Sequence, residues 1–212
     1  MMIKAVIFDV GGVLALVKKP IKIKDGVKVS GVHSMIAKEL KISLDQWFDS
    51  IDSVYADAIE GISPYHKIIK TMAQNNKIPI KKLEGLIVKT YRDKFKVNKL
   101  LFKEAFKLKE KGYKIVVLSD QWHLSKIALM SDEIYKKFNL NIVSCDVGFR
   151  KPNPKIYKLL LKKLKVPAKN CLFIDNQEWN IKPAEKLGMK TILFENNKQA
   201  IKELNKIIGN KK

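Results

Sequence analysis

Arginine is nearly absent from this chain of 212 residues, since only Arg92 and Arg150 occur among its 42 cationic side chains. Proteins that bind nucleic-acid phosphates use arginine widely, because its guanidinium group pairs with phosphate through two hydrogen bonds. The formal net charge of +21 is therefore carried almost entirely by lysine. We interpret it as a lysine-rich solvated surface. The composition argues against a nucleic-acid partner, although an anionic partner stays open.

Cysteines and long apolar runs are also scarce. Two cysteines, Cys145 and Cys171, cannot form the dense disulfide framework of a small secreted domain. Both fall on predicted strands, and we expect them to be thiols of the core. No apolar run reaches the 18 residues of a membrane span, and the N-terminal apolar run stops at Asp9 without a small-residue cleavage site. Hydrophobic residues make up 46% of the chain, which is enough for a core. We expect a cytoplasmic globular protein that does not associate with membranes.

Short β-branched and aromatic segments alternate with helical patterns along most of the chain. Strands are predicted at residues 4–8, 114–118, 141–145, 171–174 and 190–194, and helices at 98–111, 122–138, 154–165, 176–188 and from 197 onward. Strands separated by helices of this length join through right-handed crossovers. The sequence therefore predicts an α/β fold, a Rossmann-like doubly wound parallel sheet.

The segment between the first two strands follows a different pattern. Apolar residues alternate on both sides of Asp25-Gly26, which predicts a β-hairpin over residues 21–29. From residue 31 to 96 the pattern is helical. Its starts and stops are marked by Ser43 and Gln46 (a capping box), Gly61, Ser63-Pro64 (an N-cap followed by proline at the first helical position) and Pro79. We predict a core formed by residues 1–17 and 97–212. Residues 18–96 form a flap hairpin and an inserted all-helical cap.

Polar residues stand immediately after, or a few residues beyond, four of the predicted strands. They are Asp9, Ser119 with Asp120, Lys151 and Asp175. Ligands of such sheets bind beyond the carboxyl ends of the strands. Two carboxylates can hold Mg²⁺, which retains several waters and takes phosphate oxygens as further ligands. A hydroxyl and an ammonium group can bind those oxygens, and a carboxylate can attack phosphorus.

Each of these residues also has an ordinary structural explanation. An aspartate after a strand commonly forms a turn or caps a helix, and Ser119 could cap the following helix. Lys151 is one of many lysines in this chain. Their joint placement at four strand ends favours a functional site.

Four segments carry a family resemblance: residues 7–14 (IFDVGGVL), 117–120 (VLSD), 150–157 (RKPNPKIY) and 173–181 (FIDNQEWNI). Over its whole length the chain resembles haloacid dehalogenase-like hydrolases with a C1 helical cap. The resemblance implies Asp9 as the nucleophile, Ser119 as a phosphate binder and Lys151 as the neutralising cation. It implies a magnesium site formed by Asp9, the Gly11 carbonyl and Asp175, and phosphatase activity.

One departure from the family concerns proton transfer. Phosphatases of this family usually carry a second aspartate, the general acid and base, at the position of Gly11. Its loss matters because general acid catalysis is typically worth about 10²–10⁴-fold. Either the substrate has a good leaving group, such as an anomeric sugar, acyl or aryl phosphate, or another residue supplies the proton. His33, His66 and His123 are candidates, and each could equally be an ordinary surface or helix residue.

Two further departures affect the charge of the site. Asn176 stands where the family often has a second aspartate, which should weaken magnesium binding somewhat. Asn180 could still hydrogen-bond a metal ligand. Asp120 replaces the asparagine common after the motif-two hydroxyl, and it would repel phosphate unless it faces the metal or the cap.

The sequence thus predicts a Mg²⁺-dependent phosphomonoester hydrolase acting on a small phosphorylated metabolite such as a sugar phosphate. We expect Asp9, Ser119 and Lys151 to be catalytic, and Ser119, Asp120 and Lys151 to bind substrate. The alternative is a non-catalytic binding protein of the same fold that offers a phosphate pocket and a lysine-rich surface to a nucleic acid or an acidic partner. The sequence does not indicate an oligomeric state.

Overall fold

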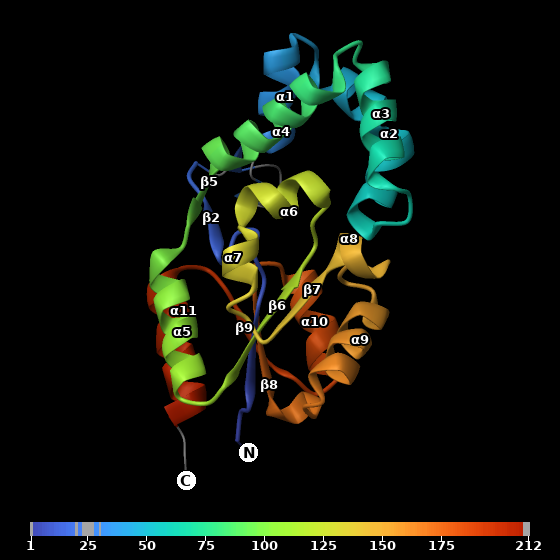
Figure 1. Cartoon of the computed structure of the whole chain (residues 1–212). Helices are drawn as coiled ribbons and strands as arrows, with labels where there is room; N and C mark the ends of the chain where they lie inside the picture. The colour runs from blue at the N-terminus through green and yellow to red at the C-terminus, as the bar shows by residue number, and fades with distance from the viewer. Residues whose placement is uncertain (1, 20, 23–27, 30, 210–212) are drawn as a thin grey trace.

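The computed structural model describes residues 2–19, 21–22, 28–29 and 31–209. A central sheet of five strands forms its framework (Figure 1). The strand order is β7 (Leu140–Val143), β6 (Lys114–Ser119), β1 (Ala5–Phe8), β8 (Cys171–Asp175) and β9 (Lys190–Leu193). All neighbouring pairs are parallel, so the predicted α/β class and doubly wound parallel sheet are confirmed.

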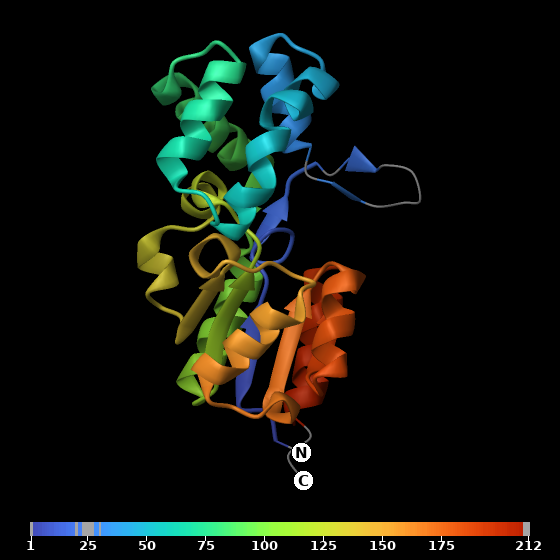
Figure 2. The same cartoon turned by 90° about the vertical axis from the view of Figure 1, so that its right-hand side faces the viewer.

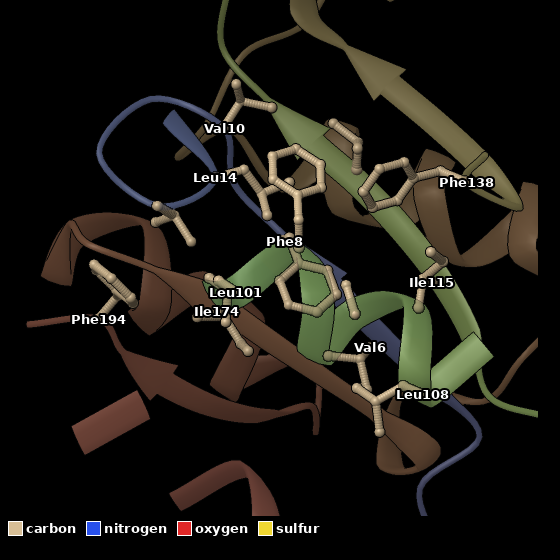
Figure 3. Packing of buried hydrophobic residues seen from close by; sticks show 14 of the residues in the cluster. Val6, Phe8, Val10, Leu14, Leu101, Leu108, Ile115, Phe138, Ile174 and Phe194 are labelled. Atoms are coloured by element: carbon tan, nitrogen blue, oxygen red, sulfur yellow. The ribbon is translucent and has the colours of Figure 1, made fainter. Parts of the chain in front are cut away.

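Helices cover both faces of this sheet (Figure 2). One face packs against α5 (Lys99–Glu110) and α11 (Asn197–Gly209), and the other against α9 (Pro154–Leu164) and α10 (Glu178–Lys186). Successive residues of β1 alternate between the two: Val6 and Phe8 belong to the first layer, shown in Figure 3, and Ala5 and Ile7 to the second. A strand buried on both faces explains why the sequence shows a continuous apolar run there.

Four helices are inserted between β1 and β6 and form a separate layer above the sheet (Figure 1). They are α1 (Val32–Leu40), α2 (Leu44–Glu60), α3 (Tyr65–Asn75) and α4 (Ile80–Lys94), hereafter the helical insertion. Their apolar faces enclose a third hydrophobic cluster, which also contains Leu124 of α6 (His123–Leu129) and Trp122, the residue just before that helix. The helical insertion is therefore packed directly onto the segment that follows β6.

Two short antiparallel pairs flank the helical insertion. Strand β2 (Ala15–Val17) pairs with β5 (Phe95–Val97), so the predicted helical stretch ends at Lys94 rather than at residue 96. Strand β3 (Ile21–Lys22) pairs with β4 (Lys28–Val29), as expected for the hairpin. The predicted turn at Asp25-Gly26 lies outside the described residues.

Most predicted helix boundaries agree with the structure. Ser43 and Gln46 form the capping box of α2, and Gly61 ends that helix in the left-handed conformation. The predicted N-cap at Ser63 is wrong, because Pro64 occupies the cap position of α3 and the Ser63 hydroxyl donates a hydrogen bond to Asp57. None of the helices in the described part of the chain is long and apolar enough to cross a membrane.

Two predicted elements are wrong in extent. The helix expected over 122–138 is divided into α6 and α7 (Asp132–Tyr135), because Met130 and Ser131 adopt extended backbone. Ser131 followed by two acidic residues is a typical helix start. The strand expected over 141–145 ends at Val143, and Cys145 lies in the short helix α8 (Ser144–Val147).

Gly61 is held where the helical insertion meets α8. It has a φ of 66°, and a Cβ atom at this position would overlap the carbonyl oxygen of Cys145. Gly61→Ala should therefore cost about 1–2 kcal/mol of unfolding free energy for the left-handed backbone, and a further 1–3 kcal/mol or so for the overlap. Gly112→Ala is the matched control, because Gly112 has a φ of 86° but open space around it. Equal losses in denaturant titrations would contradict the packing role of Gly61.

Candidate active site

Four of the five polar residues predicted at strand ends lie together in the structure: Asp9, Ser119, Lys151 and Asp175. Strands β6, β1 and β8 are parallel neighbours, so their carboxyl ends bring Ser119, Asp9 and Asp175 to one edge of the sheet. Lys151 reaches the same edge from the loop before α9. All four side chains are buried. The sheet topology thus assembles them from distant parts of the chain.

Lys151 links the two carboxylates. Its Nζ atom lies 3.0 Å from Asp9 Oδ1 and 2.6 Å from Asp175 Oδ2, and it donates a hydrogen bond to the carbonyl oxygen of Leu118 at 3.3 Å. Burial alone disfavours the charged ammonium, but the carboxylates of Asp175, Asp9 and Asp120 outweigh it and hold the Lys151 pKa above its ordinary value. A buried lysine fixed as a cation is suited to neutralise phosphate oxygens.

The Asp9 carboxyl group is buried at the end of the first strand of the sheet. Burial raises the pKa of Asp9 to about 7, while the neighbouring Lys151 opposes this rise and Asp175 adds to it. A nucleophile must be the carboxylate, so a further cation beside Asp9 would favour the reactive form. Metal binding and activation of Asp9 would therefore be coupled.

Asp175 is fixed by the segment that follows β8. Its Oδ1 atom accepts hydrogen bonds from the Gln177 backbone N–H at 2.8 Å and from Asn180 Nδ2 at 3.2 Å. Asn180 Nδ2 also lies 3.1 Å from Oδ2. The expected hydrogen bond from Asn180 to a carboxylate of the site is therefore present. These contacts orient Asp175 before any ligand binds.

Asp120 faces the loop that carries Lys151. Its Oδ1 atom accepts a hydrogen bond from the Lys151 backbone N–H at 3.0 Å. Burial raises the pKa of Asp120, although Lys151 and that hydrogen bond counteract the rise. The structure thus shows a loop-holding contact for Asp120. A direct contact with substrate stays a prediction.

The loop after β1 has two glycines with different surroundings. A Cβ atom on Gly11 would meet nothing within 4 Å, whereas on Gly12, whose φ is 89°, it would lie 2.6 Å from Asn176 Nδ2. The Oδ1 atom of Asn176 is buried without a hydrogen-bond partner. Gly12 thus lets the loop pack against the segment after Asp175, and Gly11 borders open space.

These surroundings suit a hard divalent cation. Magnesium is usually held by one or two carboxylates together with waters and substrate phosphate. Asp9, Asp175 and the Gly11 carbonyl would form such a set, since none of the hydrogen bonds among the described residues uses that carbonyl. The orphaned amide oxygen of Asn176 is one that Mg²⁺ or one of its waters would satisfy. Protein zinc sites use three or four histidine, cysteine or acidic ligands. No cluster of three such residues occurs in the part of the chain that the structure describes.

The three histidines considered as proton donors differ in their surroundings. His33 accepts a hydrogen bond from Trp47 Nε1 at 2.9 Å, lies 3.1 Å from the Tyr55 hydroxyl, and has a pKa lowered to about 4 by burial. His66 is exposed on α3. His123 packs on Tyr65 beside a cavity of about 780 Å³ between α4 and α6, and burial lowers its pKa. The described contacts of these imidazoles do not include the four strand-end residues.

The two tryptophans near the site differ in environment. Trp122 is buried in the cluster of the helical insertion, whereas Trp179 is 50% exposed. Trp122 is thus a packing residue. The two cysteines are free and buried, so the sequence expectation of core thiols holds for both, although only Cys171 lies on a strand.

A Rossmann-like sheet with a buried aspartate–lysine–aspartate arrangement at its carboxyl edge is the combination that the family resemblance of the sequence implies. The chain belongs to the haloacid dehalogenase-like hydrolases, whose family model matches residues 3–188. It is an enzyme of the hydrolase class, as the sequence predicted.

Similar proteins support this assignment. The chain is 36% identical over 118 residues to bifunctional epoxide hydrolase 2 of Mus musculus, covering 53% of this chain and 21% of that protein. It is 30% identical over 231 residues to the Sus scrofa counterpart, covering 99% of this chain and 39% of that protein. The chain therefore spans well under half the length of these relatives.

A solved structure shows the same fold. A haloacid dehalogenase family enzyme from Bacteroides thetaiotaomicron, in complex with magnesium and inorganic phosphate, matches with a TM-score of 0.71 at 18% identity. The match covers 94% of this chain and 98% of that one.

Proposed function

We propose that this hydrolase is a Mg²⁺-dependent phosphatase that cleaves phosphomonoesters through an aspartyl-phosphate on Asp9. The observation that carries the proposal is the buried Lys151 ammonium between Asp9, at 3.0 Å, and Asp175, at 2.6 Å. Such a cation stabilises negative charge that develops next to the nucleophile. The magnesium and phosphate bound by the Bacteroides enzyme support the same chemistry.

The proposed reaction has two steps, phosphoryl transfer to Asp9 and hydrolysis of the aspartyl-phosphate. An Asp9 carboxylate oxygen attacks phosphorus, a P–O bond forms, and the bond to the leaving oxygen breaks. Ser119 and Lys151 hold the non-bridging phosphoryl oxygens during this transfer. Water then hydrolyses the aspartyl-phosphate and returns the Asp9 carboxylate and inorganic phosphate. Mg²⁺, held by Asp9, the Gly11 carbonyl and Asp175, would supply charge neutralisation.

The helical insertion suits the role of a substrate-selecting cap. It lies above the carboxyl edge of the sheet (Figure 1). Arg150, next to Lys151, forms a 3.3 Å ion pair with Glu60 at the end of α2. We propose the predicted division into residues 1–17 with 97–212 as the core and 18–96 as flap and cap. A small phosphorylated metabolite, such as a sugar phosphate, fits a site covered in this way, and we propose a cytoplasmic location.

Hydrolysis of an aryl phosphate with and without Mg²⁺ tests this function. We expect turnover with Mg²⁺, loss of at least about 90% of the rate after chelation, and recovery when Mg²⁺ is restored. Calcium is a useful control, because its longer and more flexible coordination fits a magnesium site poorly. Phosphate binding without Mg²⁺-dependent turnover would instead favour the non-catalytic binding protein, and salt-sensitive retention of nucleic acid would support that reading further.

A further inference from the structure

Gln121 is a buried polar residue that the sequence analysis did not single out. It lies two residues after Ser119, and its side chain is 3% exposed. Its Nε2 atom donates a hydrogen bond to Ser119 Oγ at 3.0 Å and lies 3.5 Å from the Tyr135 hydroxyl. The amide thus touches the phosphate-binding hydroxyl directly.

The backbone of Gln121 is held on both sides. Its N–H donates to Ser144 Oγ at 2.9 Å, and the Ser144 hydroxyl donates to its carbonyl oxygen at 3.1 Å. Ser144 is fully buried at the start of α8. A side chain carried on a backbone fixed in this way has little freedom to turn away from Ser119.

The direction of the bond from Gln121 determines what Ser119 can do. A hydroxyl has one donor hydrogen and two acceptor lone pairs. When Gln121 donates to Ser119 Oγ, it uses a lone pair and leaves the Ser119 hydrogen free. Ser119 and Asp9 stand at the carboxyl ends of neighbouring parallel strands, and the Ser119 hydroxyl opposes the rise in the Asp9 pKa that burial causes. The free hydrogen can therefore be given to Asp9 or to a phosphoryl oxygen at the same place.

The cost of this arrangement is visible in the structure. The Gln121 Oε1 atom is buried without a hydrogen-bond partner. Buried polar atoms without partners are rare. An amide that served packing alone could be replaced by an apolar side chain without this penalty.

We propose that Gln121 is a positioning residue that turns the Ser119 hydroxyl hydrogen toward the transferring phosphoryl group. The role rests on the phosphatase function proposed above. Gln121 touches neither substrate nor nucleophile in this scheme and acts entirely through Ser119.

Two substitutions separate this role from packing. Gln121→Met keeps the side-chain length and removes the donor, so kcat/KM for an aryl phosphate should fall about tenfold, the usual worth of one hydrogen bond. Gln121→Glu keeps the shape of the side chain. Because burial raises the pKa of a carboxyl group, the rates are compared at a pH where this glutamate is ionised. It then offers only acceptors, and the Ser119 hydrogen is drawn away from phosphate. The loss for Gln121→Glu should therefore exceed that for Gln121→Met at least about tenfold. A glutamate as active as wild type would overturn the proposal, because it would mean that the amide oxygen faces Ser119.

A double-mutant cycle with Ser119→Ala tests whether Gln121 acts through Ser119. With no hydroxyl to orient, Gln121→Met should change kcat/KM less than about twofold in the Ser119→Ala background. Independent losses in the two backgrounds would contradict the positioning role. The melting temperature of each variant shows whether a change in kcat/KM comes from misfolding.

A measurement of phosphate affinity tests the role of Gln121 without relying on turnover. Calorimetry with inorganic phosphate and Mg²⁺ should show the same order of weakening, with Gln121→Glu weaker than Gln121→Met and Gln121→Met weaker than wild type. If the wild type binds phosphate but hydrolyses no ester, the proposed function fails while this order still decides the role of Gln121. The same phosphate affinity in all three proteins would overturn the positioning role of Gln121.

Discussion

Asp9→Asn is expected to lower kcat for an aryl phosphate by at least about 10³-fold, since removal of a covalent nucleophile is among the most damaging changes in an enzyme. The amide keeps the size of the side chain and can still accept a hydrogen bond from Lys151. It cannot attack phosphorus and form a stable acyl phosphate. Steady-state rates at saturating Mg²⁺ measure the effect, and equal rates for wild type and variant would exclude the Asp9 mechanism.

Folding should survive this change. Lys151 retains Asp175 as a partner at 2.6 Å, so the variant leaves no unpaired buried cation. Burial already disfavours the charged form of Asp9, whose pKa is raised, and a neutral amide avoids that penalty. We expect a melting temperature within a few degrees of wild type. Asp146→Asn is the activity control, because Asp146 pairs with Lys126 at a partly exposed site and belongs to no step of the proposed reaction.

A second readout identifies the intermediate directly. Wild-type enzyme quenched during turnover should carry a covalent phosphate on the peptide that contains Asp9, detectable by mass spectrometry. Asp9→Asn should carry none. If the covalent phosphate is found on the peptide that contains Ser119 and not on the Asp9 peptide, the nucleophile is the Ser119 hydroxyl.

The core fold could be predicted from the sequence because its signals are local. Residues 4–8 and 171–174 are apolar runs of strand length, and buried parallel strands produce this pattern. The capping box at Ser43 likewise depends on two residues three positions apart. In both cases a few neighbouring residues contain the whole signal.

The grouping of Asp9, Ser119, Lys151 and Asp175 was also predictable, because the carboxyl ends of neighbouring parallel strands share one edge. The contact of Gln121 with Ser119 was not. It depends on Ser144, more than 20 residues away, which fixes the backbone of Gln121. Likewise, Trp122 enters the cluster of the helical insertion only because α6 packs on α4, and no short-range pattern in the sequence indicates this.

Gly11 offers a direct test of the missing proton donor. The position borders open space, since a Cβ atom there would meet nothing within 4 Å, and its φ lies outside the left-handed region. An aspartate can therefore be introduced at the family's general-acid position without a steric clash at Cβ. Gly12 differs, because its φ is 89° and a Cβ atom would collide with Asn176.

Gly11→Asp should increase kcat for alkyl phosphates by up to about 10²-fold, at the low end of the range for general acid catalysis. An alkyl leaving oxygen needs a proton as the P–O bond breaks, whereas an aryl oxygen with a low pKa does not. Turnover of an activated aryl phosphate should therefore change less than about threefold. The diagnostic quantity is the ratio of the two rates, which removes any general effect on binding or folding.

Two matched variants complete this experiment. Gly11→Ala fills the same space without an acid and should leave the alkyl-to-aryl ratio unchanged, while Gly12→Ala should lower both rates and the melting temperature together. If wild type already hydrolyses alkyl and aryl phosphates equally fast, another group supplies the proton and a good leaving group is not required. If Gly11→Asp leaves the ratio unchanged in a folded, Mg²⁺-binding protein, the open space beside Gly11 does not face the leaving oxygen. An increase confined to alkyl substrates would show that the chemistry lost at this position limits the natural enzyme to esters whose leaving groups depart without a proton.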